Sequence, residues 1–170
     1  MDQFNFSDRE LFMDRRYFMM SQHFNKSSPD EFGLVPTTNP DIFILPQDNS
    51  KWKYRQLYDF GWGNEEGYFR IPLPDFHTLL NIIMFSDIED NIFGAAAVVL
   101  SDYPEELLKE CKHILHDENI PLEYLKLFKI LNLDKPLNRS PIIGKSLSEI
   151  SQDYEIWKNI ADAVRRKMDG

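Results

Sequence analysis

The sequence predicts a mainly α fold made of stacked antiparallel helical hairpins or a compact helical bundle. From residue 72 onward, apolar residues recur at helical spacing, and a helix start signal precedes each apolar run. The connections between the runs up to residue 131 are short, as in helical hairpins, and a longer loop over residues 132–145 precedes the last helix. The first 71 residues show few such patterns, so we expect an irregular N-terminal third there. We therefore predict a single domain, 1–170, with an irregular N-terminal portion, 1–71, and a helical array, 72–170.

Each helix of the predicted array has an identifiable start. Pro74 and Pro104 suit the first turn of a helix, where a backbone N–H is not needed. Residues 86–89 and 146–149 follow the S-x-x-E pattern of a capping box, in which two side chains satisfy each other's backbone donors. Pro121 begins a further helix. The apolar stripe expected on the last helix comprises Ile150, Tyr154, Trp157, Ala161, Val164 and Met168.

The N-terminal portion is expected to hold one helix and little regular structure after it. A capping box at residues 7–10 predicts a peripheral helix that ends at residue 23. Prolines prevent a long helix between residues 25 and 49, where 42–45 is either a short strand or an extended apolar segment. Residues 50–58 are expected to form a short helix.

A glycine-rich stretch of aromatic and acidic residues follows, over residues 60–69. Its three glycines permit turns. The stretch therefore forms either a small hairpin across residues 64–67 or an ordered loop.

The composition restricts the classes of function. The formal net charge is −9, which disfavours nucleic acid and anionic membranes as partners and suits a basic protein partner. Hydrophobic residues are 42% of the chain, enough for a packed core. Cys111 is the single cysteine, so an intrachain disulfide and a thiolate metal cluster are excluded. No signal peptide or membrane-length apolar run is visible, and a cytoplasmic protein is expected.

Two histidines are the chief candidates for chemistry. His113 and His116 are three residues apart on one predicted helix, but a metal site needs at least one more ligand. Cys111 lies on the apolar stripe of the same helix, where a cysteine acts as a small hydrophobe. We therefore expect no catalytic residues, no metal and no cofactor.

The predicted partner-binding residues combine aromatic side chains with carboxylates. Aromatic residues dominate the energetics of protein interfaces, and carboxylates suit a basic partner. Folding of these aromatic residues into the core is the competing interpretation. The predicted set is Trp62, Glu65, Glu66, Tyr68, Phe69, Asp87, Glu89 and Asp90.

Residues 87–100 resemble the second helix of a HEAT-type repeat. An acidic turn at 87–90 is followed by Ile92, Ala96 and Leu100 at spacings of four, although Phe93 stands where such repeats usually have arginine. Small residues at 94–97 would let a neighbouring helix approach closely. The resemblance covers residues 72–131 and implies stacked helical pairs.

The chain is also similar in size, acidity and helix content to small acidic bacterial immunity proteins. This resemblance implies a protein that binds and occludes a basic toxin or nuclease. Two alternatives stay open: a small metal-dependent or acid–base hydrolase that uses His113 and His116, and a structural subunit of a larger assembly. The sequence leaves a homo-oligomer open as well.

Overall fold

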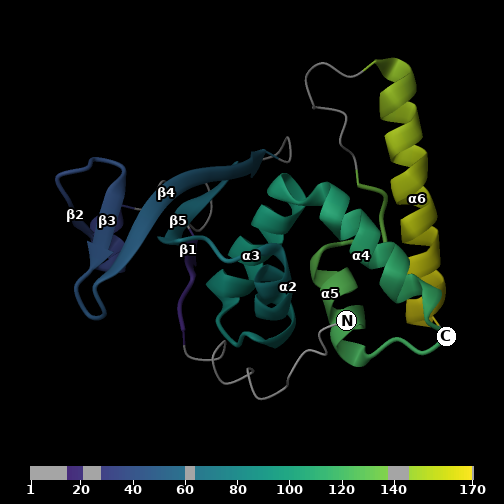
Figure 1. Cartoon of the computed structure of the whole chain (residues 1–170), viewed down its shortest axis with the longest axis horizontal. Helices are drawn as coiled ribbons and strands as arrows, with labels where there is room; N and C mark the ends of the chain where they lie inside the picture. Colours follow the sequence, from purple (N-terminus) through teal and green to yellow (C-terminus); the bar gives the residue numbers. More distant parts are fainter. Residues whose placement is uncertain (1–14, 21–27, 60–63, 138–145, 170) are drawn as a thin grey trace. The chain divides into compact units, whose positions relative to one another are not determined.

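The computed structural model describes residues 15–20, 28–59, 64–137 and 146–169. It shows a mixed α/β protein in which a five-stranded antiparallel sheet precedes a series of helices (Figure 1). The predicted mainly α fold of stacked helical hairpins, whether repeats or a bundle, is therefore wrong. The chain divides into two compact units, Met1–Tyr103 and Pro104–Gly170. The single domain predicted from chain length stays a prediction.

The described elements follow one another with short connections, apart from the intervals outside the described residues. They are β1 (Phe18–Met20), the 3₁₀ helix η2 (Pro29–Phe32), β2 (Val35–Pro36), β3 (Ile42–Leu45), β4 (Ser50–Asp59), β5 (Asn64–Ile71), α2 (Phe76–Phe85), α3 (Glu89–Asp102), α4 (Pro104–His116), α5 (Leu122–Ile130) and α6 (Leu147–Asp169).

The sheet has the strand order β1-β5-β4-β3-β2, and every neighbouring pair is antiparallel. Its centre is the long pair β4 and β5, in which Tyr54 lies opposite Tyr68. On the far side of β5, Met19 of β1 lies opposite the same Tyr68. Strand β1 thus joins the edge of a sheet whose other strands follow it in the chain.

The short helix expected at residues 50–58 is a strand instead. The run Lys51-Trp52-Lys53 alternates charged and aromatic side chains, and in β4 both lysines are exposed while Trp52 is fully buried. A period of two places alternate side chains on opposite faces of a strand. Aromatic residues also favour strands, so the alternation was the informative signal.

The other N-terminal predictions fare differently. Of the two alternatives left open at 42–45, the short strand is present as β3. The predicted turn at 64–67 lies inside β5, so the hairpin across it is wrong. Most of the predicted first helix lies outside the described residues, but its described part contains β1, whose three residues are all buried. The irregular N-terminal portion is thus largely a sheet.

One face of the sheet carries an aromatic cluster. Tyr68 makes edge-on contacts with Phe32, Phe43 and Tyr54, with ring centroids 5.7, 5.3 and 5.4 Å away. Such geometry suits the quadrupoles of aromatic rings. Trp52 packs in the same cluster, and its indole N–H donates to Ser50 Oγ at 2.7 Å. This face therefore forms a core together with η2.

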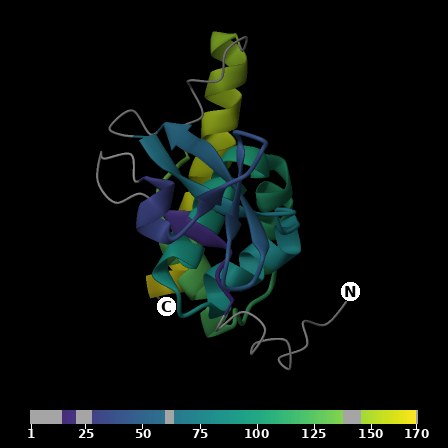
Figure 2. The same ribbon diagram turned by 90° about the vertical axis from the view of Figure 1, so that its left-hand side faces the viewer.

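The opposite face of the sheet packs against α3, and Figure 2 shows the strands in front of this helix. Gly94 permits the approach: a Cβ added there would lie 2.6 Å from the Cβ of Phe18 and 2.5 Å from its Cδ1. The small residues at 94–97 were expected to receive a second helix. At Gly94 the close neighbour is a strand residue, so the HEAT-type arrangement implied for this helix is wrong.

Of the two capping boxes predicted within the helical array, one is present and one is not. At the start of α6, the Ser146 N–H donates to Glu149 Oε2 at 2.7 Å and the Glu149 N–H donates to Ser146 Oγ at 3.3 Å. This capping box is confirmed. At 86–89 the Ser86 Oγ accepts from the Ile88 N–H and from Asn91 Nδ2, both at 3.2 Å, so it caps no Glu89 amide.

The second unit packs α4 against α6. The buried face of α6 comprises Trp157, Ile160, Ala161 and Val164, and α4 contributes Leu107, Cys111 and Ile114 to the core. Near the end of α6, Lys167 Nζ donates to the carbonyl oxygens of Asp117 and Glu118 at 2.7 and 2.9 Å. These bonds tie the C-terminal end of α6 to the segment that follows α4.

Among the described helices, none combines the length and the apolar character needed to cross a membrane.

Candidate functional site

The first half of α6 exposes apolar side chains in a regular stripe. Leu147, Ile150 and Tyr154 are spaced i, i+3 and i+7, which places them on one face of the helix. Leu147 is 84% exposed and Tyr154 is 44% exposed, whereas Trp157, next on the same stripe, is 1% exposed. One continuous stripe is therefore buried in its second half and uncovered in its first. We name residues 147–156 the exposed segment of α6.

The exposed segment extends beyond the other helices of its unit. In Figures 1 and 2 the N-terminal end of α6 projects past α4 and α5, which lie beside its C-terminal half. The capping box at Ser146 and Glu149 satisfies backbone donors of the first turn. The segment is thus a helix whose first turn is held by its own cap and whose apolar side chains remain accessible.

The charge of this segment is negative. Between Ser146 and Trp157 the chain contains three carboxylates and no lysine or arginine. The carboxylates belong to Glu149, Asp153 and Glu155. An exposed apolar stripe beside acidic residues is suited to a partner with an apolar groove and a basic rim.

Two predicted partner-binding residues belong to the core of the sheet. Tyr68 and Phe69 are 2% and 8% exposed, so they offer little surface to a partner. Glu66 is half-buried and accepts a hydrogen bond from the Tyr54 hydroxyl, and partial burial together with this carboxylate raises the pKa of Tyr54 far above its usual value. Trp62 lies outside the described residues, and Glu65 belongs to β5.

The acidic residues at the start of α3 are at the surface. Asp87 and Glu89 are exposed, and their role in partner binding stays a prediction. Asp90 is half-buried: its burial raises the pKa of the carboxyl group, although the backbone of Met20 and the charge of Arg16 act in the opposite direction. Asp90 thus contributes to the junction between α3 and β1. It belongs to α3, whereas Glu66 of the same predicted set belongs to β5.

The histidines predicted as candidates for chemistry are both exposed on α4. Among the described residues, no group of three or more His, Cys, Asp and Glu side chains is placed to hold a metal ion. The hydrolase hypothesis for His113 and His116 therefore gains no third ligand from this part of the chain.

Cys111 is buried to 1% exposure, and burial, with a smaller contribution from Glu110, raises the pKa of its thiol to about 12. Because the thiolate is the reactive form, we expect native Cys111 to react with iodoacetamide at pH 8 at least about 100-fold more slowly than in urea-unfolded protein. Mass spectrometry of quenched time points measures both rates. Equal rates would contradict this burial.

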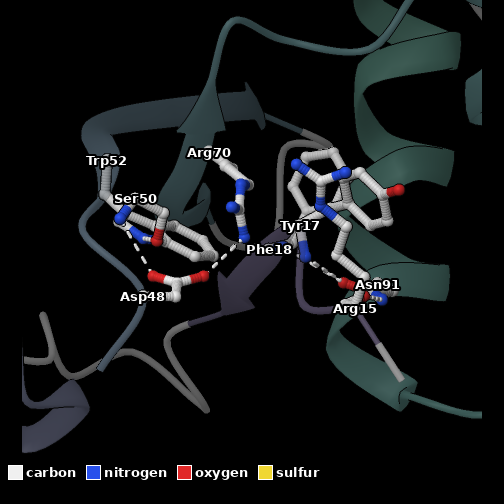
Figure 3. Close-up of polar contacts among 8 residues, drawn as sticks. All are labelled: Arg15, Tyr17, Phe18, Asp48, Ser50, Trp52, Arg70 and Asn91. Atoms are coloured by element: carbon white, nitrogen blue, oxygen red, sulfur yellow. Dashed lines mark hydrogen bonds and ion pairs between the residues drawn. The ribbon is translucent and has the colours of Figure 1, made fainter. Parts of the chain in front are cut away.

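A buried asparagine connects β1 to α3, as Figure 3 shows. Asn91 Oδ1 accepts from the backbone N–H groups of Tyr17 and Phe18 at 2.7 and 3.1 Å. Its Nδ2 donates to the Arg15 carbonyl oxygen at 2.8 Å. Buried polar groups need such partners. Here one side chain satisfies three backbone groups of the segment 15–18, which leads into β1 and precedes Asn91 by more than 70 residues.

A second polar network lies at the start of β4 (Figure 3). Arg70 Nη1 contacts Asp48 Oδ2 at 2.9 Å, and Asp48 Oδ1 accepts from the Ser50 N–H at 2.9 Å. Partial burial alone would raise the pKa of Asp48, but the hydrogen bonds from Ser50 and the charge of Arg70 lower it overall. Arg70 is thereby held in a fixed orientation beside Asp48.

Comparison of the chain with protein-family models, with curated proteins and with solved structures gave no match. Function must therefore be inferred from the chain's own residues and their geometry.

Sequence patterns missed Leu147 and Ile156 as interaction residues, although Ile156 is 38% exposed. The apolar stripe expected on the last helix began at Ile150, and nothing in it separated a buried half from an uncovered half. A stripe that continues for 23 residues beside a helix α4 of 13 residues was a signal that part of it lacks cover.

Proposed function

We propose that this protein is a protein-binding module that uses the exposed segment of α6 to hold a basic partner. The single observation that carries the proposal is the apolar stripe that is buried at Trp157 and uncovered at Leu147 and Tyr154. Contiguous exposed apolar surface rimmed by polar residues marks interaction sites. A projecting amphipathic helix fits an apolar groove through residues spaced i, i+3 and i+7.

The acidic character of the segment supports the choice of a basic partner. With three carboxylates and no cation between residues 146 and 157, a basic rim on the partner would be attracted and an acidic one repelled. The concrete form of the proposal is an immunity-type inhibitor that occludes a basic toxin or nuclease. The cytoplasm, where the single cysteine stays reduced, is the compartment that we propose.

A photo-crosslinking experiment tests the proposal in the native cell. The full chain carries benzoyl-phenylalanine in place of Leu147, or in place of Gln152, which lies on the opposite side of the helix. We expect position 147 to capture one basic protein that position 152 does not capture. Toxicity of that protein when expressed alone, and its relief by co-expression of this chain, supports the immunity form. Capture of a second copy of this chain would contradict the proposal and support an assembly subunit.

The captured protein then serves in a quantitative test. We expect the double change Leu147→Ser and Tyr154→Ser to raise the Kd at least about tenfold, because apolar anchors dominate interface energetics. Calorimetric titration measures the Kd, and Gln152→Ser is the matched control. An unchanged Kd, with an unchanged melting temperature, would show that the partner binds elsewhere.

A further inference from the structure

We propose that a pocket beside the β5–α2 connection binds the phosphate group of a small organic phosphate, a site separate from the partner surface on α6. The pocket has a volume of about 540 Å³ and is lined by residues before β1, at the β4 start, at the β5 end and at the start of α2. This size lies within the range of small-molecule sites, roughly 300–1,000 Å³.

Three cationic side chains line this pocket: Arg15, Lys51 and Arg70. They gather in a unit that is strongly acidic elsewhere, since residues 1–103 contain 16 acidic and 8 basic residues. Asp75 is the single carboxylate of the lining, and it accepts the Thr78 N–H at 2.8 Å as the N-cap of α2. The lining is therefore net positive, and an anion is the ligand that its charge favours.

Two of these cations differ from Arg70 in their pairing. Among the described residues, neither Arg15 nor Lys51 forms an ion pair. Arg15 lies over the ring of Tyr17, 5.4 Å from its centroid (Figure 3), which orients the guanidinium without neutralising it. Arg70 is 17% exposed and is oriented by Asp48.

The backbone that carries the cations is held firmly in place. Asn91 fixes the segment from Arg15 to Phe18, and the Arg70 N–H donates to the Tyr17 carbonyl oxygen at 2.9 Å. Arg70 is thus the donor of this bond, and Arg15 lies two residues before its acceptor on the paired segment. A site whose cations are positioned before the ligand arrives loses little entropy on binding.

The lining indicates which anion fits. Guanidinium groups match the oxygen geometry of phosphate. A phosphate dianion also suits Arg15 and Lys51, with Arg70 already paired to Asp48, better than a carboxylate with its single charge does. Ile71, Pro72, Leu73 and Pro74 form an apolar part of the same lining. An organic group attached to the phosphate would pack there.

Phenyl phosphate, inorganic phosphate and benzoate are the probes. We expect phenyl phosphate to shift the amide resonances of residues 15–17 and of the non-proline residues between 70 and 75 of the full chain in a saturable way. It should bind more tightly than inorganic phosphate. Arg15→Gln and Lys51→Gln should each raise the Kd about three- to tenfold. Lys53→Gln is the matched control, because Lys53 is exposed on the same strand but outside the lining.

Three outcomes would overturn the assignment. Absence of saturable shifts with phenyl phosphate would show that the pocket binds no phosphate. If Lys53→Gln raised the Kd for phenyl phosphate as much as Lys51→Gln does, the effect would come from the overall charge of the protein and not from the pocket. If benzoate bound with the same Kd as phenyl phosphate, the pocket would not select phosphate over a carboxylate. The α6 variants Leu147→Ser and Tyr154→Ser should leave phenyl phosphate binding unchanged, which keeps this test separate from that of the proposed function.

Discussion

Replacing Asn91 by alanine is expected to lower the free energy of unfolding by about 3 kcal/mol, because the change leaves several buried backbone groups without partners. Asn91 is fully buried, and its side chain accepts from Tyr17 and Phe18 and donates to Arg15. Most of the lost stability comes from the N–H groups of Tyr17 and Phe18, which would stay buried without an acceptor. Urea denaturation followed by circular dichroism measures it.

Hydrogen exchange gives a local measurement of the same effect. In Asn91→Ala the amides of Tyr17 and Phe18 should exchange faster than in the unchanged protein, because both lose their acceptor. The control is Glu89→Gln, an exposed position in the first turn of the same helix, with an expected change below about 0.5 kcal/mol. Equal effects of the two substitutions would show that the asparagine does not connect β1 to α3.

Replacing Gly94 by alanine is expected to destabilise the protein by about 2 kcal/mol, because the new methyl group would overlap the buried Phe18. The sign of the effect is diagnostic. In an exposed helix the same substitution stabilises by about 1 kcal/mol through backbone entropy. Thermal and urea denaturation of the variant therefore distinguish close packing on the sheet from an open helix surface.

A second substitution supplies the control for this prediction. Phe18→Leu shortens the side chain that Gly94 accommodates, so the pair Gly94→Ala and Phe18→Leu should lose less stability than the two single changes added together. Strict additivity in this double-mutant cycle would contradict the contact between α3 and β1.

The helices could be predicted from the sequence, whereas most of the sheet could not. Apolar spacing and start signals placed α2, α4, α5 and α6 within a few residues of their observed bounds. Strands β1, β2 and β3 are short, and β1 pairs with β5 far along the chain, so their signal in the sequence is weak. Trp52 and Tyr54 are two positions apart, which places them on one face of a strand but on nearly opposite sides of a helix. The exposed lysines at 51 and 53 fit the same period of two, so β4 was the strand with a readable signal.

What each helix packs against could not be predicted from its own pattern. Gly94 and the alanines after it indicated a close neighbour, but a glycine fits a strand side chain as well as a second helix. Asn91 gave no signal at all, because a polar residue within a helical pattern normally faces water. Its partners lie more than 70 residues earlier in the chain.

The candidate sites show the same limit. The aromatic residues Tyr68 and Phe69 had the composition of an interface, yet they fill the core. The cations of the pocket are spread over residues 15, 51 and 70, and only the pairing of strands brings them together. The α6 stripe was visible in the sequence, but its lack of cover depends on where α4 ends.

The bond between Asn91 and the Tyr17 amide spans 74 positions of the chain, which sets a delay during synthesis on the ribosome. At a translation rate of roughly 5–20 residues per second, Phe18, Met19 and Met20 emerge about 4–15 s before the residue that anchors them. Met19 can pack on the sheet once β5 has been made, but Phe18 lacks the face of α3 that receives it for the whole interval. We therefore expect the segment at β1 to reach its final buried position only after α3 has been made.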